Sequence, residues 1–500
     1  MVEPVFEKLN FNQRVGELKE QIKVDCKTQI SSESVSGVLA VSPWVTADVS
    51  EVFGEKVKYG GKVIFYISYL DADGNLRKCE CGSEFIGELV GAEEDAKVHL
   101  SAEIDKVETD GSGANLAISS FITIKAELSG VSEVSALVGG ESLIIKEQEM
   151  NLLKGMGARR GVYPIEEEFE LNYPVKEVLY HRADAVITAV QCGVGSIIVD
   201  GETLLSLVLL QKTDKNDIIR ENRIIPFRME IECEEAMPTM QATARVKEKS
   251  FKTDIAVDDD AGKSIVSVDV SLMFEGQAFS SENVILAADA FSTENDVELV
   301  KDDCKFYKTC DLRGYSVTVG GRAEISELPV GATVLAVGNE KVSVLSTCCG
   351  ESGITVTGVL SGTVFLRDAD GKVFTRKPEV PFEKVLEGEF NCDTEITVVA
   401  KATKANAKIV ALTQTDLEAD VYFTVYPEER CAQRVVKEIK VLGEKQAPTA
   451  AISVYIPTEG EELWSLSKRL NVCPDALIAT NKDLNFPLSG KERIVIYRQK

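Results

Sequence analysis

Apolar and polar residues alternate along many short stretches of this chain. One such run places apolar side chains at every second position: Val266, Val268, Val270, Leu272 and Phe274. Residues 118–124 and 421–425 show the same period of two, which is typical of strands with one buried face. Asp73-Gly74 and Asp370-Gly371 stand between apolar runs and predict tight hairpins, because glycine accepts a positive φ. The pattern predicts a mainly β chain built from sandwich-like domains.

The same arrangement recurs three times. In each copy a glycine introduces an apolar run, a short polar turn follows, and a phenylalanine lies fourteen residues beyond the start of the turn. A V-x-x-V-L entry also precedes the first two runs, at residues 35–39 and 175–179, with a looser version at 330–335. A period of about 140–155 residues is too long for a solenoid and favours tandem domains. The copies are marked by Gly61, Asp71 and Phe85, by Gly201, Thr213-Asp214-Lys215-Asn216 and Phe227, and by Gly358, Asp368 and Phe382.

Residues 141–160 interrupt the pattern, since a few leucines and isoleucines stand among charged residues. We expect a short helix or a connector there. The predicted domains are therefore residues 1–150, 160–300 and 301–445, all β-rich, followed by a small domain at 450–500.

Charge is distributed unevenly between the body and the C-terminal end. The chain has 81 acidic and 55 basic residues, yet residues 451–500 carry a balance of +1, which leaves −27 on the rest. A body this acidic repels nucleic acid and anionic lipid. No apolar run reaches the roughly 20 residues that span a bilayer, and residues 1–20 are too charged for an export signal. We expect a soluble protein that stays in the compartment where it is made, without membrane insertion.

Catalytic and metal-binding patterns are weak. The 12 cysteines contain no C-x-x-C pair and only two histidines, His99 and His181, accompany them, so neither a zinc site nor a disulfide framework is predicted. Gly262-Lys263-Ser264 lacks the earlier glycine of a phosphate-binding loop, and Asp71-Ala72-Asp73-Gly74 lacks the later ligands of a calcium loop. We expect no catalytic residue, cofactor or metal. An enzyme with unrecognised carboxylate chemistry is the remaining alternative.

The last fifty residues carry the most specific motif. Gly460-Glu461-Glu462-Leu463-Trp464-Ser465-Leu466-Ser467, followed by Asn481, Leu484, Leu488, Gly490, Ile494 and Ile496, resembles the LysM family. The resemblance implies a βααβ fold with a strand at 453–457, helices at 462–470 and 474–481, and a strand at 493–497. Apolar spacing supports the first helix, and Pro474 suits the first turn of the second, whose Leu477 and Ile478 we expect to pack inward. The expected core residues are Leu463, Trp464, Leu466, Leu477 and Ile494.

In LysM modules that bind sugar, a shallow groove lies between the loop before the first helix and the loop after the second. Three glutamates in the first loop suit basic side chains better than neutral sugar, although acidic residues also favour a helix N-terminus. Protein binding, glycan binding and a vestigial module all remain open. Carried over, the partner-binding positions are Thr458, Glu459, Gly460, Glu461 and Glu462 on one side and Asn481, Lys482, Asp483 and Leu484 on the other.

Repeated β-domains with this entry motif resemble SPOCS domains, and their combination with one C-terminal LysM module resembles SipL-type spore coat morphogenetic proteins of clostridia. That resemblance implies a non-enzymatic scaffold in the mother-cell cytoplasm, at the forespore surface or in the spore coat. Its partner would be the polymerising ATPase of the coat basement layer, stage IV sporulation protein A, bound through the LysM module, with other coat proteins as further partners. The alternative is a LysM protein that binds peptidoglycan or cortex glycan.

Overall fold

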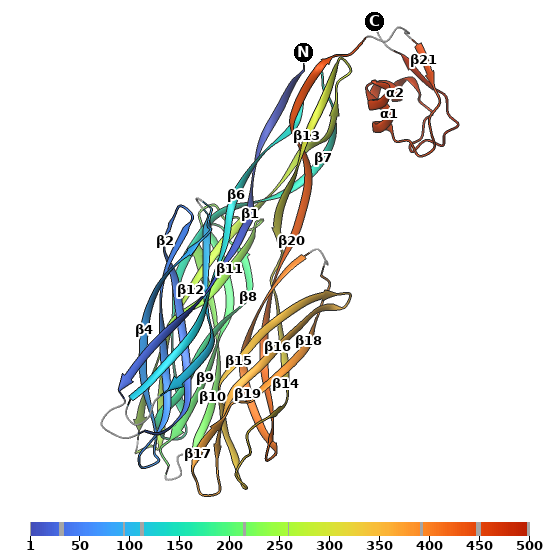
Figure 1. Cartoon of the computed structure of the whole chain (residues 1–500). Helices are drawn as coiled ribbons and strands as arrows, with labels where there is room; N and C mark the ends of the chain where they lie inside the picture. Colours follow the sequence, from blue (N-terminus) through green and yellow to red (C-terminus); the bar gives the residue numbers. More distant parts are fainter. Residues whose placement is uncertain are drawn as a thin grey trace.

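The computed structural model describes residues 2–29, 35–93, 96–110, 115–213, 217–258, 260–390, 394–446 and 452–497. These residues form a mainly β protein with two short helices near the C-terminus. The sheets build three sandwiches, a stalk that rises from them, and a small module at the end of the stalk (Figure 1).

Each sandwich consists of two antiparallel sheets with the same strand order. In sandwich 1, β1 (Glu3–Gln29), β6 (Asn115–Glu141) and β5 (Lys97–Asp110) face β2 (Val35–Phe53), β3 (Lys56–Asp71) and β4 (Leu76–Val90). In sandwich 2, β7 (Ile144–Leu171), β12 (Lys263–Phe291) and β11 (Gln241–Asp258) face β8 (Val175–Cys192), β9 (Ser196–Gln211) and β10 (Ile218–Glu232). In sandwich 3, the first strand is split into β13 (Asn295–Thr309) and β14 (Arg313–Glu324). Both pair with β20 (Gln414–Glu444), which also pairs with β19 (Thr394–Ala411). The facing sheet contains β15 (Thr333–Gly350), β16 (Gly353–Arg367), β17 (Val373–Arg376) and β18 (Glu379–Glu387).

Alternating apolar residues fill the sandwich interiors, as the period of two predicts. Val266, Val270, Leu272 and Phe274 on β12 are buried in the core of sandwich 2. Ile118, Ile122 and Ile124 on β6 and Val421, Phe423 and Val425 on β20 hold the corresponding positions in the other two cores. The central strand of each first sheet therefore supplies one fully buried row of side chains to its core.

The repeated glycine and phenylalanine are cross-strand partners in all three sandwiches. Gly61 pairs with Phe85, Gly201 with Phe227 and Gly358 with Phe382. A Cβ atom on Gly61 would lie 2.3 Å from the Phe85 ring, and the other two glycines leave similarly little room, at 2.4 and 2.5 Å. The glycine is required because the phenylalanine ring on one side and a backbone carbonyl of the neighbouring strand on the other, 2.3–2.5 Å from the Cβ position, leave no room for a side chain, which gives the repeat a steric cause.

The predicted hairpin turns are present at Asp71 and Asp368. The carboxylate of each accepts hydrogen bonds from backbone N–H groups two and four residues further on, at 3.0 and 2.8 Å in both turns. The turn of the second copy, at residues 213–216, lies largely outside the described residues.

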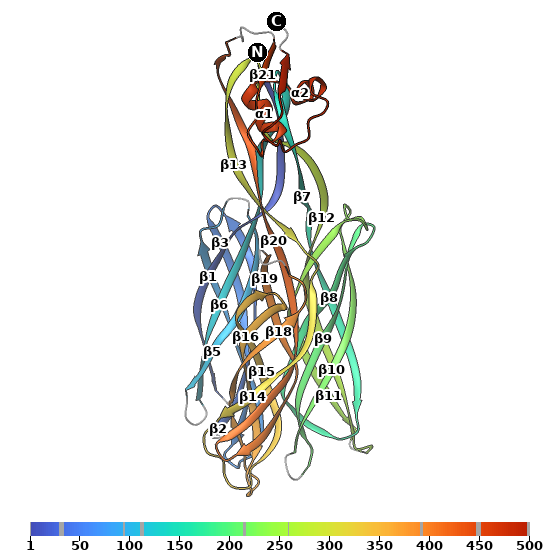
Figure 2. The same cartoon turned by 90° about the vertical axis from the view of Figure 1, so that its right-hand side faces the viewer.

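Three long two-stranded ribbons leave the sandwiches at the same end and pack together as the stalk (Figures 1 and 2). They are formed by the outer parts of β1 and β6, of β7 and β12, and of β13 and β20. The three ribbons share an apolar core to which each contributes aromatic or aliphatic side chains, among them Phe11, Leu152 and Phe306. At the opposite end, Leu39, Leu179 and Phe365 belong to a second cluster with members from all three sandwiches. The sandwiches therefore pack around a common axis with an apolar cluster at each end.

The prediction of a helix or connector at residues 141–160 is wrong. Ile144–Leu171 is the single strand β7, and a tight turn joins it to β6. The expected domain limits at residues 150 and 160 consequently fall inside one strand. In the ribbon, one face of β7 is solvated, so charged residues dilute the apolar alternation.

The C-terminal module contains β21 (Ile452–Tyr455), α1 (Leu463–Leu470), α2 (Pro474–Thr480) and β22 (Ile494–Tyr497), with β21 antiparallel to β22. Leu466, Leu477 and Ile494 are buried in its core, and Leu463 packs against them. Ile478, expected to point inward, is 45% exposed. Neither helix of the described chain is long and apolar enough to span a membrane.

Candidate functional site

The module is attached to the tip of the stalk through one face of α1. The Trp464 indole Nε1 donates a hydrogen bond of 2.9 Å to Asp289, near the end of β12. Its ring meets Phe291 edge-to-face, with centroids 5.3 Å apart. The expectation that Trp464 belongs to the module core is therefore wrong, since its partners lie on the stalk. Local helical spacing does not distinguish a core position from a docking position one step around the helix.

Polar contacts extend this docking surface. Lys468 donates to both carboxylate oxygens of Asp289 at 2.8 Å, and Asn471 donates to the Thr293 carbonyl at 2.7 Å. Lys445, just after β20, donates to the Asn471 side-chain oxygen, also at 2.7 Å. Burial opposes ionisation of Asp289, but its bonds to Lys468 and Trp464 outweigh that effect and lower the pKa of its carboxyl. An ionised Asp289 therefore anchors both helix side chains at once.

Two predicted groove residues are occupied within the module. Glu461 accepts a hydrogen bond of 3.0 Å from the Thr458 backbone N–H and forms an ion pair with Arg469. Asn481 donates to the Leu477 and Val495 carbonyls and accepts from the Val495 N–H, at 2.8–2.9 Å. These side chains fix the ends of the two loops, so neither is available to a partner as predicted. Leu484 also packs against the module core.

The other predicted groove positions present side chains or backbone to solvent. Thr458, Glu459, Gly460 and Glu462 are exposed in the first loop, and Lys482 and Asp483 in the second. Two of the three glutamates thus remain free to meet a basic partner. Because the module contacts the stalk through α1, these loops are not covered by the docking contact.

A second exposed surface of the module escaped sequence reasoning. The outer face of the two-stranded sheet carries Ile452, Val454, Ile456 and Tyr497, which are between 57% and 67% exposed. Ile452 lies opposite Tyr497 across the sheet, so the four side chains form one apolar patch. Such a patch on so small a module is typical of a protein-contact surface. In the sequence, this patch is indicated by the run Ile452-Ser453-Val454-Tyr455-Ile456, which places apolar or aromatic residues on both faces of a strand.

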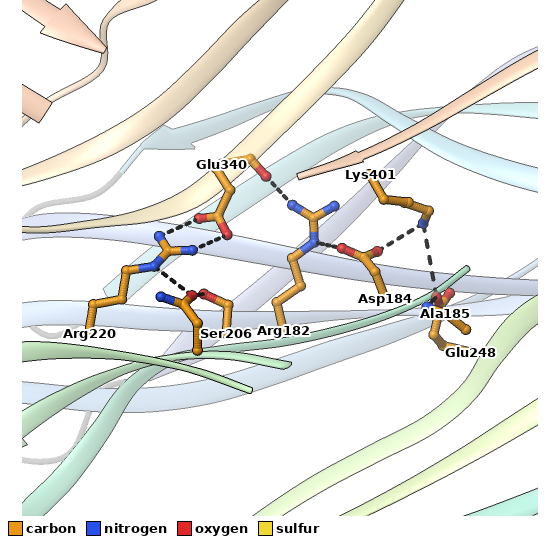
Figure 3. Close-up of polar contacts among 9 residues, drawn as sticks. Arg182, Asp184, Ala185, Ser206, Arg220, Glu248, Glu340 and Lys401 are labelled. Carbon is orange, nitrogen blue, oxygen red and sulfur yellow. Dashed lines mark hydrogen bonds and ion pairs between the residues drawn. The ribbon is translucent and has the colours of Figure 1, made fainter. Parts of the chain in front are cut away.

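A cluster of ion pairs is buried between sandwiches 2 and 3 (Figure 3). Arg220 on β10 contacts both carboxylate oxygens of Glu340 on β15, at 2.7 and 3.1 Å, and the Glu340 side chain is completely buried. Nearby, Asp184 pairs with Arg182 and accepts a bond of 2.8 Å from Lys401 of sandwich 3. Burial opposes ionisation of Asp184, but the charges of Arg182 and Lys401 prevail and lower its pKa. Every one of these carboxylates has a cationic partner, which suits a structural role between sandwiches.

A cavity of about 1060 Å³ lies where the three sandwiches meet below the stalk. Two ion pairs cross it between sandwiches: His99 of sandwich 1 contacts Glu275 of sandwich 2, and Arg245 of sandwich 2 contacts Glu127 of sandwich 1. Burial works against ionisation of Glu127, but Arg245 lowers the pKa of its carboxyl to about 2. No group of three or more metal-ligating side chains is found within the described ranges. The cavity therefore offers paired charges that hold sandwiches 1 and 2 together.

Comparison with known proteins finds no match to a protein-family model, to a curated protein or to a solved structure. What this chain does must therefore be inferred from its own residues and their geometry.

Proposed function

We propose that this protein is a non-enzymatic scaffold of spore coat assembly whose C-terminal module, of LysM type, binds the polymerising ATPase of the coat basement layer, stage IV sporulation protein A. The observation that carries the proposal is the position of the module. It stands at the tip of a long stalk, with its charged loops and its apolar sheet face uncovered. A small domain held in this way is suited to recognition.

The LysM assignment is supported by the order of the four elements and by the place of the motif residues on them. The loop Thr458–Glu462 precedes α1, Asn481 ends α2, and Leu488 closes the first loop by accepting a bond of 2.8 Å from the Gly460 N–H. The three sandwiches, with their shared strand order and glycine–phenylalanine pairs, are the counterparts of the SPOCS-like copies.

A protein partner fits the two exposed surfaces better than a glycan does. Apolar side chains such as Val454 and Tyr497 gain most from contact with another apolar surface, and Glu459 and Glu462 attract basic groups. A polymeric partner adds a further advantage, since several weak sites linked in one chain gain strength when they engage neighbouring units of one polymer. The proposed location is the mother-cell cytoplasm, at the forespore surface or in the coat, and other coat proteins are candidate partners of the sandwiches.

Glycan binding is the competing function, because the LysM resemblance itself points to peptidoglycan or cortex. Co-sedimentation of the full chain separates the two. One set of tubes contains the ATPase polymerised with ATP, and the other contains purified peptidoglycan. We expect the chain to pellet with the polymer. Pelleting with peptidoglycan alone would overturn the proposal.

Module variants locate the contact. Replacing Glu459 and Glu462 together by lysine tests the loops, and Val454→Asp tests the sheet face. At least one should weaken polymer binding by tenfold or more, which corresponds to about 1.4 kcal/mol. Asp475→Lys, an exposed change on α2, is the matched control and should stay within twofold. If both test variants bind as well as the unchanged protein, the module is not the partner-binding part.

A further inference from the structure

Three cysteines of sandwich 1 gather at one lateral edge of the sandwich. Cys26 lies on β1, at the edge of one sheet, and Cys79 and Cys81 lie on β4, at the edge of the facing sheet. Cys26 is buried, and the other two pack against the same core while remaining partly exposed. These thiols therefore face one another across the gap between the two sheets, here called the β1–β4 seam.

Two observations identify the closest pair. The Cys26 thiol lies 3.6 Å from the carbonyl of Gly82, the residue that follows Cys81. Besides burial, the Cys26 thiol also contributes to the raised pKa of the Cys81 thiol, as expected for two neighbouring sulfur groups. Cys79 points to the same side of β4 but is two residues, or roughly 7 Å, further along the strand. Cys26 and Cys81 are thus the pair that a disulfide can join with the least movement.

The other sandwiches close the corresponding seam without cysteine. Cys81 precedes Phe85 by four residues, and Arg223 stands four residues before Phe227 in sandwich 2. The Arg223 guanidinium lies 4.9 Å from the centre of the Phe169 ring on β7, so a cation–π contact spans the seam there. In sandwich 3, Arg376 donates to the carbonyls of Ser326 and Glu327 beyond β14. In sandwich 1, the described contact at this place is the one made by the thiols.

We propose that Cys26 and Cys81 are a disulfide-forming site that covalently closes the β1–β4 seam when a hydroperoxide reaches sandwich 1. The partly exposed Cys81 thiolate attacks the peroxide O–O bond, becomes a sulfenic acid and releases an alcohol. Cys26 then attacks the sulfenic sulfur, the S–S bond forms, and water leaves. Two thiols and one hydroperoxide thus give one disulfide, one alcohol and one water, and the two electrons come from the thiols.

The site is built to react slowly. Burial raises the pKa of the Cys81 thiol well above its usual value and that of Cys79 to about 11, so few thiolates exist at neutral pH. The rate of disulfide formation should accordingly rise about tenfold per pH unit between pH 7 and 9. Once formed, the bond joins the two sheets and closes a loop of about 55 residues, which disfavours the unfolded chain.

The test uses the full chain treated with tert-butyl hydroperoxide. Remaining thiols are blocked with N-ethylmaleimide, and non-reduced peptides are analysed by mass spectrometry. Digestion that includes cleavage after Glu80 separates Cys79 from Cys81. We expect the peptide of Cys26 to be linked to that of Cys81, and the urea midpoint of sandwich 1 to rise after oxidation.

Variants sharpen the result. Cys81→Ser should reduce crosslinking of Cys26 by at least tenfold, whereas the matched control Cys79→Ser should leave it unchanged. A predominant Cys26–Cys79 link, a link between two chains, or Cys26 that is still fully alkylated after oxidation of the unchanged protein would each overturn the proposal. The peptide map of the unchanged protein decides the question even if a variant fails to fold.

Discussion

Acidification should weaken the contact between sandwiches 1 and 2 through His181. This residue lies on β8, and its ring stands between Tyr66 of sandwich 1 and Phe251 of sandwich 2, with ring centroids 4.3 and 4.6 Å away. One ring nitrogen, Nδ1, is 3.1 Å from the Thr253 hydroxyl. The other, Nε2, is buried and has no hydrogen-bond partner among the described residues. A protonated ring would therefore place an uncompensated charge between two aromatic side chains.

The size of the effect follows from the pKa of the ring. Burial, together with the charge of Lys78, lowers the pKa of His181 from 6.5 to about 4. The unfolded chain binds the proton near pH 6.5 and the folded chain only near pH 4. The stability that the neutral His181 ring contributes is therefore complete above pH 6.5 and is lost as the pH falls toward 4. The free energy of unfolding should drop by about 1.4 kcal/mol on going from pH 7.5 to 5.5, and by about 2.5 kcal/mol at pH 4.5.

Two measurements check this reasoning. The chain has only two histidines, so ¹³C-histidine labelling gives two ring signals, and His99→Gln assigns the remaining one to His181. Its chemical shift should titrate near pH 4. In parallel, urea unfolding of the unchanged protein and of His181→Phe is followed from pH 7.5 to 4.5. Phenylalanine keeps the aromatic packing and cannot be protonated. Between pH 7.5 and 4.5 the free energy of unfolding of the unchanged protein should therefore fall by about 2.5 kcal/mol more than that of His181→Phe.

A His181 signal that titrates near pH 6.5 would show that the ring is solvated and that the packing described here is wrong. If the pKa is low but both proteins lose stability in parallel, carboxylates rather than His181 govern the acid sensitivity. His99→Gln serves as the control in the unfolding series, since it removes the other histidine.

Three further predictions concern packing. Arg220→Met removes the cation that pairs with the buried Glu340 carboxylate and should lower the free energy of unfolding by about 3–5 kcal/mol, measured with urea. Adding Glu340→Leu should recover most of that loss. If Arg220→Met alone is as stable as the unchanged protein, the ion pair is not buried as described. Gly201→Ala should cost at least about 1–3 kcal/mol, measured as a lower melting temperature, because the added Cβ would meet both the Phe227 ring and the Val186 carbonyl; Phe227→Leu in the same chain should relieve only the part due to the ring, and an unchanged melting temperature of Gly201→Ala would argue against the clash. Trp464→Ala should detach the module, seen as faster amide exchange at residues 288–294 while the sandwich cores stay protected; unaltered exchange would mean that Trp464 does not hold the module.

Much of the β architecture was predictable from sequence. The alternation at residues 266–274 and the Asp-Gly turns depend on local chemistry, and both appear where expected. The repeated glycine and phenylalanine were visible as a spacing, although only the cross-strand register explains why they occur together. Strand β7 was missed because one face of a ribbon is open to water, which weakens the alternation.

The candidate site was harder to predict because its side chains are committed by distant partners. Glu461 looked free in the sequence, yet it pairs with Arg469, which lies two residues beyond the motif. Trp464 fits a helical core stripe, and nothing near it in sequence reveals that Asp289 and Phe291 contact it. Contacts between parts of a chain that are more than 170 residues apart leave no local pattern.

The common axis of the three sandwiches has a consequence for stoichiometry. Three similar units around one line have the form of a trimer, yet a single covalent chain supplies all of them. A trimer of separate chains would carry three identical heads. In the described chain the ribbon of the third unit leads into the C-terminal module, which lies at one end of the common axis and so gives the three units a direction. If the module binds a polymer as proposed, each copy would occupy one place on it, while the three sandwiches present flanks that differ from one another.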